Sequence, residues 1–230
     1  MKVEVLPDST SVARRAAQLV AAEARAAVAL RGRFTVAVSG GDTPWQMLQA
    51  LTREDVPWSA VHLFQVDERV APAGDPDRNL THIAESLLAK APLPRAQLHA
   101  MPVEASALAD AAARYANELR AVAGAPPVLD LVHLGLGPDG HTASLVPGDP
   151  ALDVTEDDVT VTGVYQGHLR MTLTFPTLDR ARRILWLVTG AEKQPMLARL
   201  RAGDPSIPAG RVRSEHALIL ADAAAVGGES

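Results

Sequence analysis

The 230-residue sequence contains no cysteine, which excludes disulfide bonds and thiolate metal sites. Lysine is also scarce and occurs only at Lys2, Lys90 and Lys193. No apolar run approaches the length that crosses a bilayer, and residues 1–6 lack the charged-then-apolar layout of a signal peptide. Together these absences lead us to expect a cytoplasmic protein that does not associate with membranes.

An excess of positive charge is missing as well. The formal net charge is −5, which argues against a general nucleic-acid binder. A phosphorylated substrate would therefore need a local cluster of cationic side chains. Hydrophobic residues make up 47% of the chain, enough for a full core. We expect one domain over residues 1–230, with 223–230 as a frayed tail, in a monomer or small homo-oligomer.

Short apolar runs alternate with longer helical patterns along most of the chain. The expected strands are 2–6, 34–39, 61–66, 97–101, 129–136, 159–164, 169–175, 183–189 and 216–221. The expected helices are 9–30, 44–51, 79–90, 106–122 and 192–200. Three of the strands are apolar on both faces, which is typical of a parallel sheet covered on both sides. The sequence predicts a three-layer, Rossmann-like α/β fold, in which ligands bind at the carboxyl ends of the strands.

The first polar strand end runs from Ser39 to Pro44. Gly40 and Gly41 allow a sharp turn, Thr43 is a good helix N-cap, and Pro44 suits the first helical position. The free N–H groups of such a helix start form an anion site. An ordinary strand-to-helix turn accounts for the same residues equally well.

The second strand end carries Asp67, Glu68 and Arg69. Two carboxylates and a guanidinium can serve as acid, base and anion clamp. A solvated charge cluster is the commoner meaning of such a triplet. Both interpretations stay open on these residues alone.

The third strand end, residues 135–144, is the most distinctive. It matches G-x-G-x-x-G after a strand, but Pro147 and Pro150 rule out the crossover helix that a dinucleotide site requires. What remains is a glycine-rich turn that presents Asp139 and His141. Because an imidazole ordinarily titrates near neutrality, we favour a role in proton transfer for His141 over a surface histidine that only stabilises its turn.

Further cations follow later strand ends. Arg170 begins a strand, and Lys193 lies at a strand-to-helix turn, so both can reach an anion held by residues 39–43. Arg211 is a weaker candidate of the same kind. Each of them alone is more often a solvated surface charge. The chain has no zinc-ligand spacing and no G-x-S-x-G motif, so we expect no metal site and no nucleophilic role for Ser144.

These segments, in this order, resemble the 6-phosphogluconolactonase family, within the larger group that includes glucosamine-6-phosphate deaminase. The matching segments are 39–44, 66–69 with Asn79, 135–148, 170–174 and 188–193. The resemblance implies hydrolysis of the sugar-phosphate lactone 6-phosphogluconolactone to 6-phosphogluconate in the oxidative pentose phosphate pathway, without a cofactor. Two departures are Asp42, where the family often has Ser, and Val146, where it often has Phe. Asp42 adds a negative charge beside the expected phosphate loop.

For this reaction we expect three catalytic residues: His141, Asp139 and Asp67. His141 would take a proton from the water that attacks the lactone carbonyl, and Asp139 or Asp67 would orient His141 or position the water. The expected substrate and phosphate ligands are Ser39, Gly40, Gly41, Thr43, Arg69, Arg170 and Lys193.

Two alternatives remain. An aminosugar-phosphate deaminase or isomerase would share most of these residues, but the resemblance leads us to expect a further acid after the His141 turn in that case, and residues 142–148 contain none. A non-catalytic sugar-phosphate sensor usually carries a DNA-binding segment, and we find no spare basic helical region. The intact Asp139–His141 pair favours an enzyme over a sensor.

Overall fold

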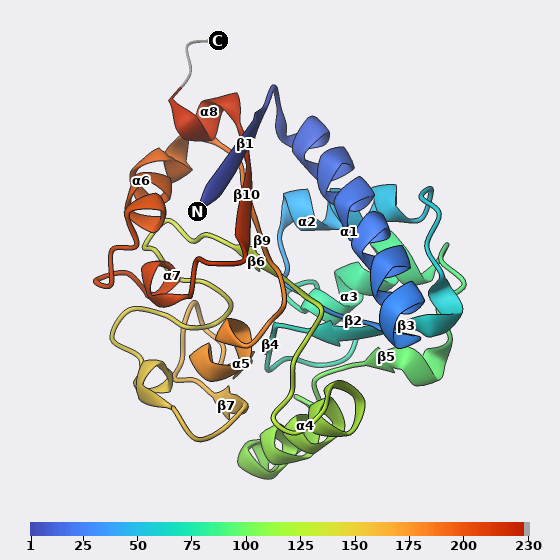
Figure 1. Ribbon diagram of the computed structural model, residues 1–230. Helices are drawn as coiled ribbons and strands as arrows, with labels where there is room; N and C mark the ends of the chain where they lie inside the picture. Colours follow the sequence, from blue (N-terminus) through green and yellow to red (C-terminus); the bar gives the residue numbers. More distant parts are fainter. Residues whose placement is uncertain (228–230) are drawn as a thin grey trace.

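The computed structural model describes residues 1–227, and its centre is a seven-stranded sheet in which every neighbouring pair of strands is parallel. The strand order is β1-β10-β9-β6-β2-β3-β5. The strands are Lys2–Leu6 (β1), Phe34–Val38 (β2), Val61–Gln65 (β3), Leu98–His99 (β5), Leu131–Gly135 (β6), Ile184–Val188 (β9) and Ala217–Asp222 (β10). The α/β fold predicted from the sequence is confirmed (Figure 1).

Helices cover both faces of this sheet (Figure 1). One face carries α1 (Ser9–Arg31), α2 (Asp42–Leu51) and α3 (Asn79–Ile83), the last continued by a π-helical turn, Ala84–Leu88. The other carries α4 (Leu108–Ala123), α5 (Phe175–Asp179), α6 (Gln194–Ala202), α7 (Pro208–Arg211) and α8 (Ala223–Val226). The central strands β2 and β9 are buried along their whole length, because both of their faces are covered.

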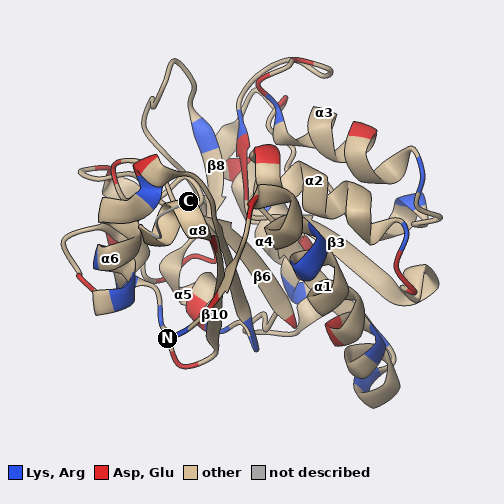
Figure 2. Ribbon diagram, turned by 90° about the horizontal axis from the view of Figure 1, so that it is seen from above, with Lys and Arg blue, Asp and Glu red and all other residues tan. Residues whose placement is uncertain are grey.

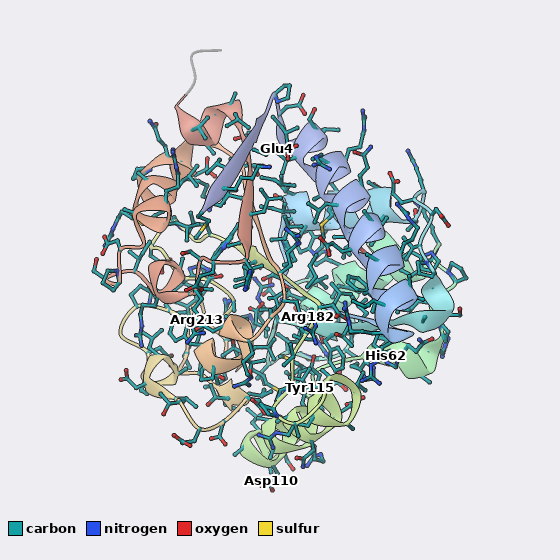
Figure 3. All side chains as sticks on the ribbon, viewed as in Figure 1. Glu4, His62, Asp110, Tyr115, Arg182 and Arg213 are labelled. Carbon is teal, nitrogen blue, oxygen red and sulfur yellow. The ribbon has the colours of Figure 1, made fainter. Side chains whose placement is uncertain are left out.

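Side chains of the helices also fix the sheet by hydrogen bonds. Tyr115, labelled in Figure 3, projects from α4 and is almost fully buried. Its hydroxyl accepts a hydrogen bond from the Gln65 backbone N–H and donates one to the Gln65 carbonyl oxygen, at 2.9 and 3.0 Å. This contact ties α4 to the end of β3, directly before the Asp67 segment.

A second, smaller sheet is antiparallel and has the order β4-β8-β7. Its strands are Asp67–Arg69 (β4), Val159–Val161 (β7) and Arg170–Leu173 (β8). Two of them confirm predicted strands over shorter spans. The third, β4, was predicted only as the polar end of the strand before it. Backbone pairing with β8 makes it a strand of its own, and this pairing joins segments about 100 residues apart, which no local pattern reveals.

The end of the chain differs from the prediction of a frayed tail over 223–230. Ala223–Val226 forms α8, in which Ala225 is buried. The Asp222 side chain caps this helix by accepting the Ala225 N–H at 2.8 Å. Residues 228–230 lie outside the described part of the chain.

The surface is mixed in charge. Lysines, arginines and acids are spread together over the outer helices (Figure 2). By contrast, the second sheet contains charged side chains that are buried: Asp67, Glu68 and Arg170. Within residues 1–227, no helix is long and apolar enough to cross a membrane.

Candidate active site

A cleft of about 400 Å³ opens at the carboxyl ends of β2, β6 and β9, beside the small sheet. This is the position expected for a ligand site in a parallel α/β sheet. The residues around it include Ser39, Gly40, Gly41, Asp42, Thr43, Asp67, Arg69, Asn79, Gly137, His141, Gln166, Arg170, Glu192 and Lys193. The structure therefore brings together all the expected catalytic and phosphate-binding residues except Asp139, which contacts His141 instead of lining the cleft.

His141 and Asp139 form a tightly held pair. The His141 Nδ1 atom lies 2.6 Å from Oδ1 of Asp139, and the His141 backbone N–H donates to the same oxygen at 3.1 Å. With Nδ1 donating its proton, Nε2 is left as the basic nitrogen. No hydrogen-bond partner for Nε2 is found among residues 1–227, and the imidazole side chain is 20% exposed to the cleft.

The glycine-rich turn leaves space for the His141 imidazole because residue 137 has no side chain. A Cβ atom on Gly137 would collide with the His141 ring, so residue 137 has to be glycine for the ring to stand where it does. The turn closes through hydrogen bonds from the Gly137 N–H to the His141 carbonyl, at 2.9 Å, and from the Gly140 N–H to the Gly137 carbonyl, at 3.1 Å. Gly140 has φ +83°, in the left-handed region that favours glycine.

The charge state of Asp139 follows from its contacts. Partial burial by itself would raise the pKa of this carboxyl, but the hydrogen bonds and charge of His141, with a hydrogen bond from the Tyr165 hydroxyl at 3.1 Å, outweigh it. The net effect is a lowered pKa for Asp139, so the carboxylate is ionised near neutral pH. An ionised Asp139 can orient His141 and stabilise it once it has accepted a proton.

Asp67 has different partners. Its two oxygens accept hydrogen bonds from the hydroxyls of Ser39, at 3.2 Å, and Ser144, at 2.6 Å. It makes no hydrogen bond to His141 within the described residues, so Asp139 is the carboxylate that contacts the imidazole. Ser144 is fully buried and donates to Asp67, which fits the expectation that it is not a nucleophile.

Two arginines face each other across the small sheet. Arg69 on β4 is the register partner of Arg170 on β8. Like charges opposite each other destabilise a sheet, unless an anion shares them. The Nε atoms of both are buried without a hydrogen-bond partner among residues 1–227. Burial, and then the charge of Arg69, lower the pKa of Arg170. The arrangement places two cationic side chains side by side at the cleft, where they can bind an anion.

The phosphate-loop candidates line the same cleft as these arginines. Helix α2 begins two residues earlier than predicted, at Asp42, so Thr43 lies inside its first turn and Gly41, with φ +127°, takes the N-cap position. The Thr43 hydroxyl is hydrogen-bonded to the Thr189 hydroxyl at 2.8 Å and caps nothing. Lys193 lines the same cleft and makes no ion pair within the described part of the chain. Asp42 is exposed at the rim.

Two residues that the sequence suggested for the site, Arg211 and Glu68, do not line the cleft. Arg211 lies outside the cleft: its guanidinium donates to the Leu152 carbonyl oxygen at 2.9 Å and stacks over Phe175. Glu68 is a structural carboxylate with no exposure and does not line the cleft. Its oxygens accept hydrogen bonds from Gln65, Arg69, Asn79 and Leu80.

Sequence reasoning also missed residues. Tyr165, Gln166 and Glu192 all contact or line the site. A hairpin signal was present, because Gln166 and Gly167 stand between two predicted strands. That signal places a turn, but it does not show that the turn reaches the cleft. For Glu192 no signal distinguishes it from an ordinary surface acid.

Comparisons with known proteins agree with this geometry. The family model for glucosamine-6-phosphate isomerases/6-phosphogluconolactonase matches residues 7–220. The 6-phosphogluconolactonase of Synechocystis sp. is 39% identical, over 95% of this chain and 93% of its own. The corresponding protein of Nostoc sp. is 36% identical, over 97% and 96%.

Solved structures of related proteins share the fold of this chain. The 6-phosphogluconolactonase of Thermotoga maritima superposes with a TM-score of 0.85 at 27% identity, covering 96% of this chain and 98% of that one. A monomeric glucosamine-6-phosphate deaminase has a TM-score of 0.86 at 18% identity, which shows the shared fold alone. The chain belongs to the glucosamine-6-phosphate isomerase/6-phosphogluconolactonase family.

Proposed function

We propose that this protein hydrolyses 6-phosphoglucono-1,5-lactone to 6-phosphogluconate, a step of the oxidative pentose phosphate pathway. The observation that carries the proposal is one cleft in which His141, hydrogen-bonded to Asp139, lies together with the facing arginines Arg69 and Arg170. The relatives named 6-phosphogluconolactonase, which match nearly the whole chain, support the same reaction.

A lactone is an ester, so one activated water is sufficient. In the proposed mechanism Nε2 of His141 removes a proton from a water molecule as its oxygen attacks C1 of the lactone. The imidazolium that forms is stabilised by Asp139. The tetrahedral intermediate then collapses, the bond from C1 to the ring oxygen breaks, and His141 returns the proton to that oxygen. Water is consumed, and an open-chain acid is released.

The negative charge that develops on the lactone carbonyl oxygen during the attack has to be stabilised by hydrogen-bond donors. Gly40 and Gly41 line the cleft, and their backbone N–H groups are the candidates for this role. In other hydrolases one such donor contributes about 3 kcal/mol to transition-state stabilisation. The phosphate lies away from the reacting carbon, so its contacts with Arg69, Arg170 and Lys193 would serve orientation.

An aminosugar-phosphate deaminase is the nearest rival, and the residues after the His141 turn favour the lactonase. The stretch 142–148 contains no Asp or Glu, so no second acid stands there to assist ring opening and amine release. A cytoplasmic location, a single domain and a monomeric or small homo-oligomeric state stay predictions.

The test is the lifetime of the lactone. Glucose-6-phosphate and its dehydrogenase generate 6-phosphogluconolactone in place, and its decay is followed with and without this protein. We expect accelerated decay that is lost in the His141→Ala variant. Decay at the spontaneous rate would contradict the proposed function. Acceleration that survives in the variant would keep the function but move the base elsewhere.

A further inference from the structure

The turn between β7 and β8 reaches the active-site cleft. It is closed by the Tyr165 N–H donating to the His168 carbonyl oxygen at 2.9 Å, with Gln166 and Gly167 at its tip. Both tip residues have left-handed backbone, with φ of +50° and +85°. For Gln166 this conformation is unfavourable, so surrounding contacts must hold it. Gln166 lines the cleft, and its Oε1 accepts a hydrogen bond from Arg170 at 3.3 Å.

Tyr165 contacts the His141–Asp139 pair on one side and Arg170 on the other. Its hydroxyl donates to Oδ2 of Asp139 at 3.1 Å, and its ring meets the His141 ring edge-to-face, with centroids 5.3 Å apart. The other partner is Arg170, whose guanidinium carbon lies 5.0 Å from the centre of the tyrosine ring. Arg170 also donates to the Tyr165 carbonyl oxygen at 3.3 Å. One residue thus joins the proposed base to a proposed phosphate ligand.

We propose that Tyr165 is a positioning residue that locks Asp139 behind His141 and holds Arg170 for the substrate phosphate. The inference rests on the proposed function, because it assigns Tyr165 a part in that reaction. The side chain touches no reacting atom in this scheme and acts only through its two neighbours.

The hydroxyl has a defined task. His141 occupies Oδ1 of Asp139, and the Tyr165 hydroxyl occupies Oδ2. A carboxylate held at both oxygens cannot rotate about its bond to Cβ, so it presents a fixed acceptor to Nδ1 of His141. Tyr165 is itself 3.5 Å from that nitrogen, a poorer contact than its bond to Asp139.

The charges around Tyr165 keep it a donor. The charged or titratable groups that face it are Asp139, His141 and Arg170. Burial, and then the charge of Asp139, raise the pKa of Tyr165, with Arg170 acting in the opposite direction. The phenol therefore stays protonated well above neutral pH, and the hydrogen bond to Asp139 persists throughout the working range.

The two tasks can be separated by substitution. Tyr165→Phe keeps the ring next to Arg170 and removes the hydroxyl, so we expect kcat to fall about tenfold, as for loss of one hydrogen bond to a charged group, with KM within about twofold. The acid limb of the kcat/KM profile should move to higher pH, because Asp139 loses a donor that stabilises its ionised form. Tyr165→Leu removes the ring as well, and KM should then rise about fivefold or more.

His168→Ala is the matched control. His168 lies in the same turn, but its imidazole contacts Asp77 and the Val70 carbonyl and not the cleft. We expect kcat, KM and the pH profile to stay as in the wild type. A loss in His168→Ala equal to that in Tyr165→Phe would overturn the proposal, since any disturbance of the turn would then be sufficient.

A readout without turnover separates this inference from the proposed function. The titration of the Asp139 carboxyl carbon is followed by NMR in the wild type, Tyr165→Phe and His168→Ala. An upward shift of the midpoint in Tyr165→Phe alone supports the positioning role, even if the lactone assay fails. An unchanged midpoint in Tyr165→Phe overturns it, even if the wild type hydrolyses the lactone.

Discussion

Oδ1 of Asp139 and Nδ1 of His141 are 2.6 Å apart, and one residue, Gly140, separates them in the chain. A pair formed inside one short turn costs little conformational entropy to assemble, because no distant segment has to be brought in. The carboxylate fixes the imidazole tautomer, so Nε2 is the nitrogen available to the cleft.

Replacement of His141 by alanine should remove catalysis and leave binding. We expect kcat to fall about 10²- to 10⁴-fold, the usual contribution of a general base, with little change in KM. The measurement is the initial rate of lactone decay over a range of substrate concentrations. His216→Ala is the control, because His216 is exposed directly before β10, at the opposite edge of the sheet from the cleft. A large rise in KM with kcat retained would contradict the assignment.

A methyl side chain at residue 137 should lower kcat, because it would displace the His141 imidazole. In Gly137→Ala the new Cβ would collide with the His141 imidazole, so the ring must leave its position beside Asp139. We expect kcat to drop at least about tenfold in a protein that still folds. Gly135→Ala offers a contrast, since a Cβ there meets no atom within 4 Å. Equal kcat values in the two alanine variants would show that the tight fit at Gly137 is not needed.

Lys193→Ala should mainly weaken substrate binding. Lys193 lines the cleft and has no ion-pair partner among residues 1–227, so its charge is available to the phosphate. Loss of one charge-assisted contact predicts a rise in KM of about tenfold with kcat within about threefold. Lys90→Ala, which removes an exposed lysine outside the cleft, controls for the change in net charge. A fall in kcat without a change in KM would place Lys193 in the chemistry.

Local sequence patterns were sufficient for the parallel sheet and for the turns at its carboxyl edge. Strands such as 184–188 are apolar on both faces, and the glycines around His141 are adjacent in the chain, so both signals are local. The small antiparallel sheet was missed because β4 pairs with β8 across about 100 residues. That pairing places Arg69 opposite Arg170 and brings the Tyr165 turn to Asp139, and neither contact has a local signature.

Some expected roles depended on details that a sequence does not carry. Thr43 has the residue type of an N-cap, but helix α2 begins two residues earlier than predicted, and the Thr43 hydroxyl is hydrogen-bonded to Thr189. Glu68 and Asp67 are adjacent acids with opposite surroundings, one enclosed by backbone N–H groups and the other facing the cleft. The two side chains point to opposite faces of β4, so their roles can be distinguished only if β4 is first recognised as a strand.

The buried carboxylate of Glu68 should be essential for stability. It accepts four hydrogen bonds at 2.7–2.8 Å, three of them from backbone N–H groups. Glu68→Gln replaces one acceptor oxygen by an NH₂ donor, which should lower the free energy of unfolding by about 3 kcal/mol. Urea unfolding measures it. Glu104→Gln is the control, because Glu104 pairs with Arg78 from a half-exposed position and should cost under about 1 kcal/mol. Equal losses would contradict the structural role of Glu68.

His133 should make the folded protein sensitive to acid. It has no exposure, and its Nδ1 accepts the Ser39 backbone N–H at 3.2 Å. Burial lowers the pKa of His133 from 6.5 to about 3. Below pH 6.5 His133 therefore binds a proton in the unfolded chain but stays neutral in the folded chain. The contribution of neutral His133 to the free energy of unfolding is complete above pH 6.5 and is lost as the pH falls toward about 3.

The acid sensitivity can be isolated by substitution. The His133 contribution to the free energy of unfolding should approach a slope of about 1.4 kcal/mol per pH unit below pH 6. His133→Gln keeps an acceptor for the Ser39 N–H and has no proton to bind, so its stability should fall less steeply between pH 7 and pH 5. Urea unfolding at pH 7, 6 and 5 compares it with the wild type and with the exposed control His216→Gln. Parallel curves for wild type and His133→Gln would mean that the folded protein accommodates a charged His133, which the apolar surroundings of its imidazole, including Leu131 and Met47, argue against.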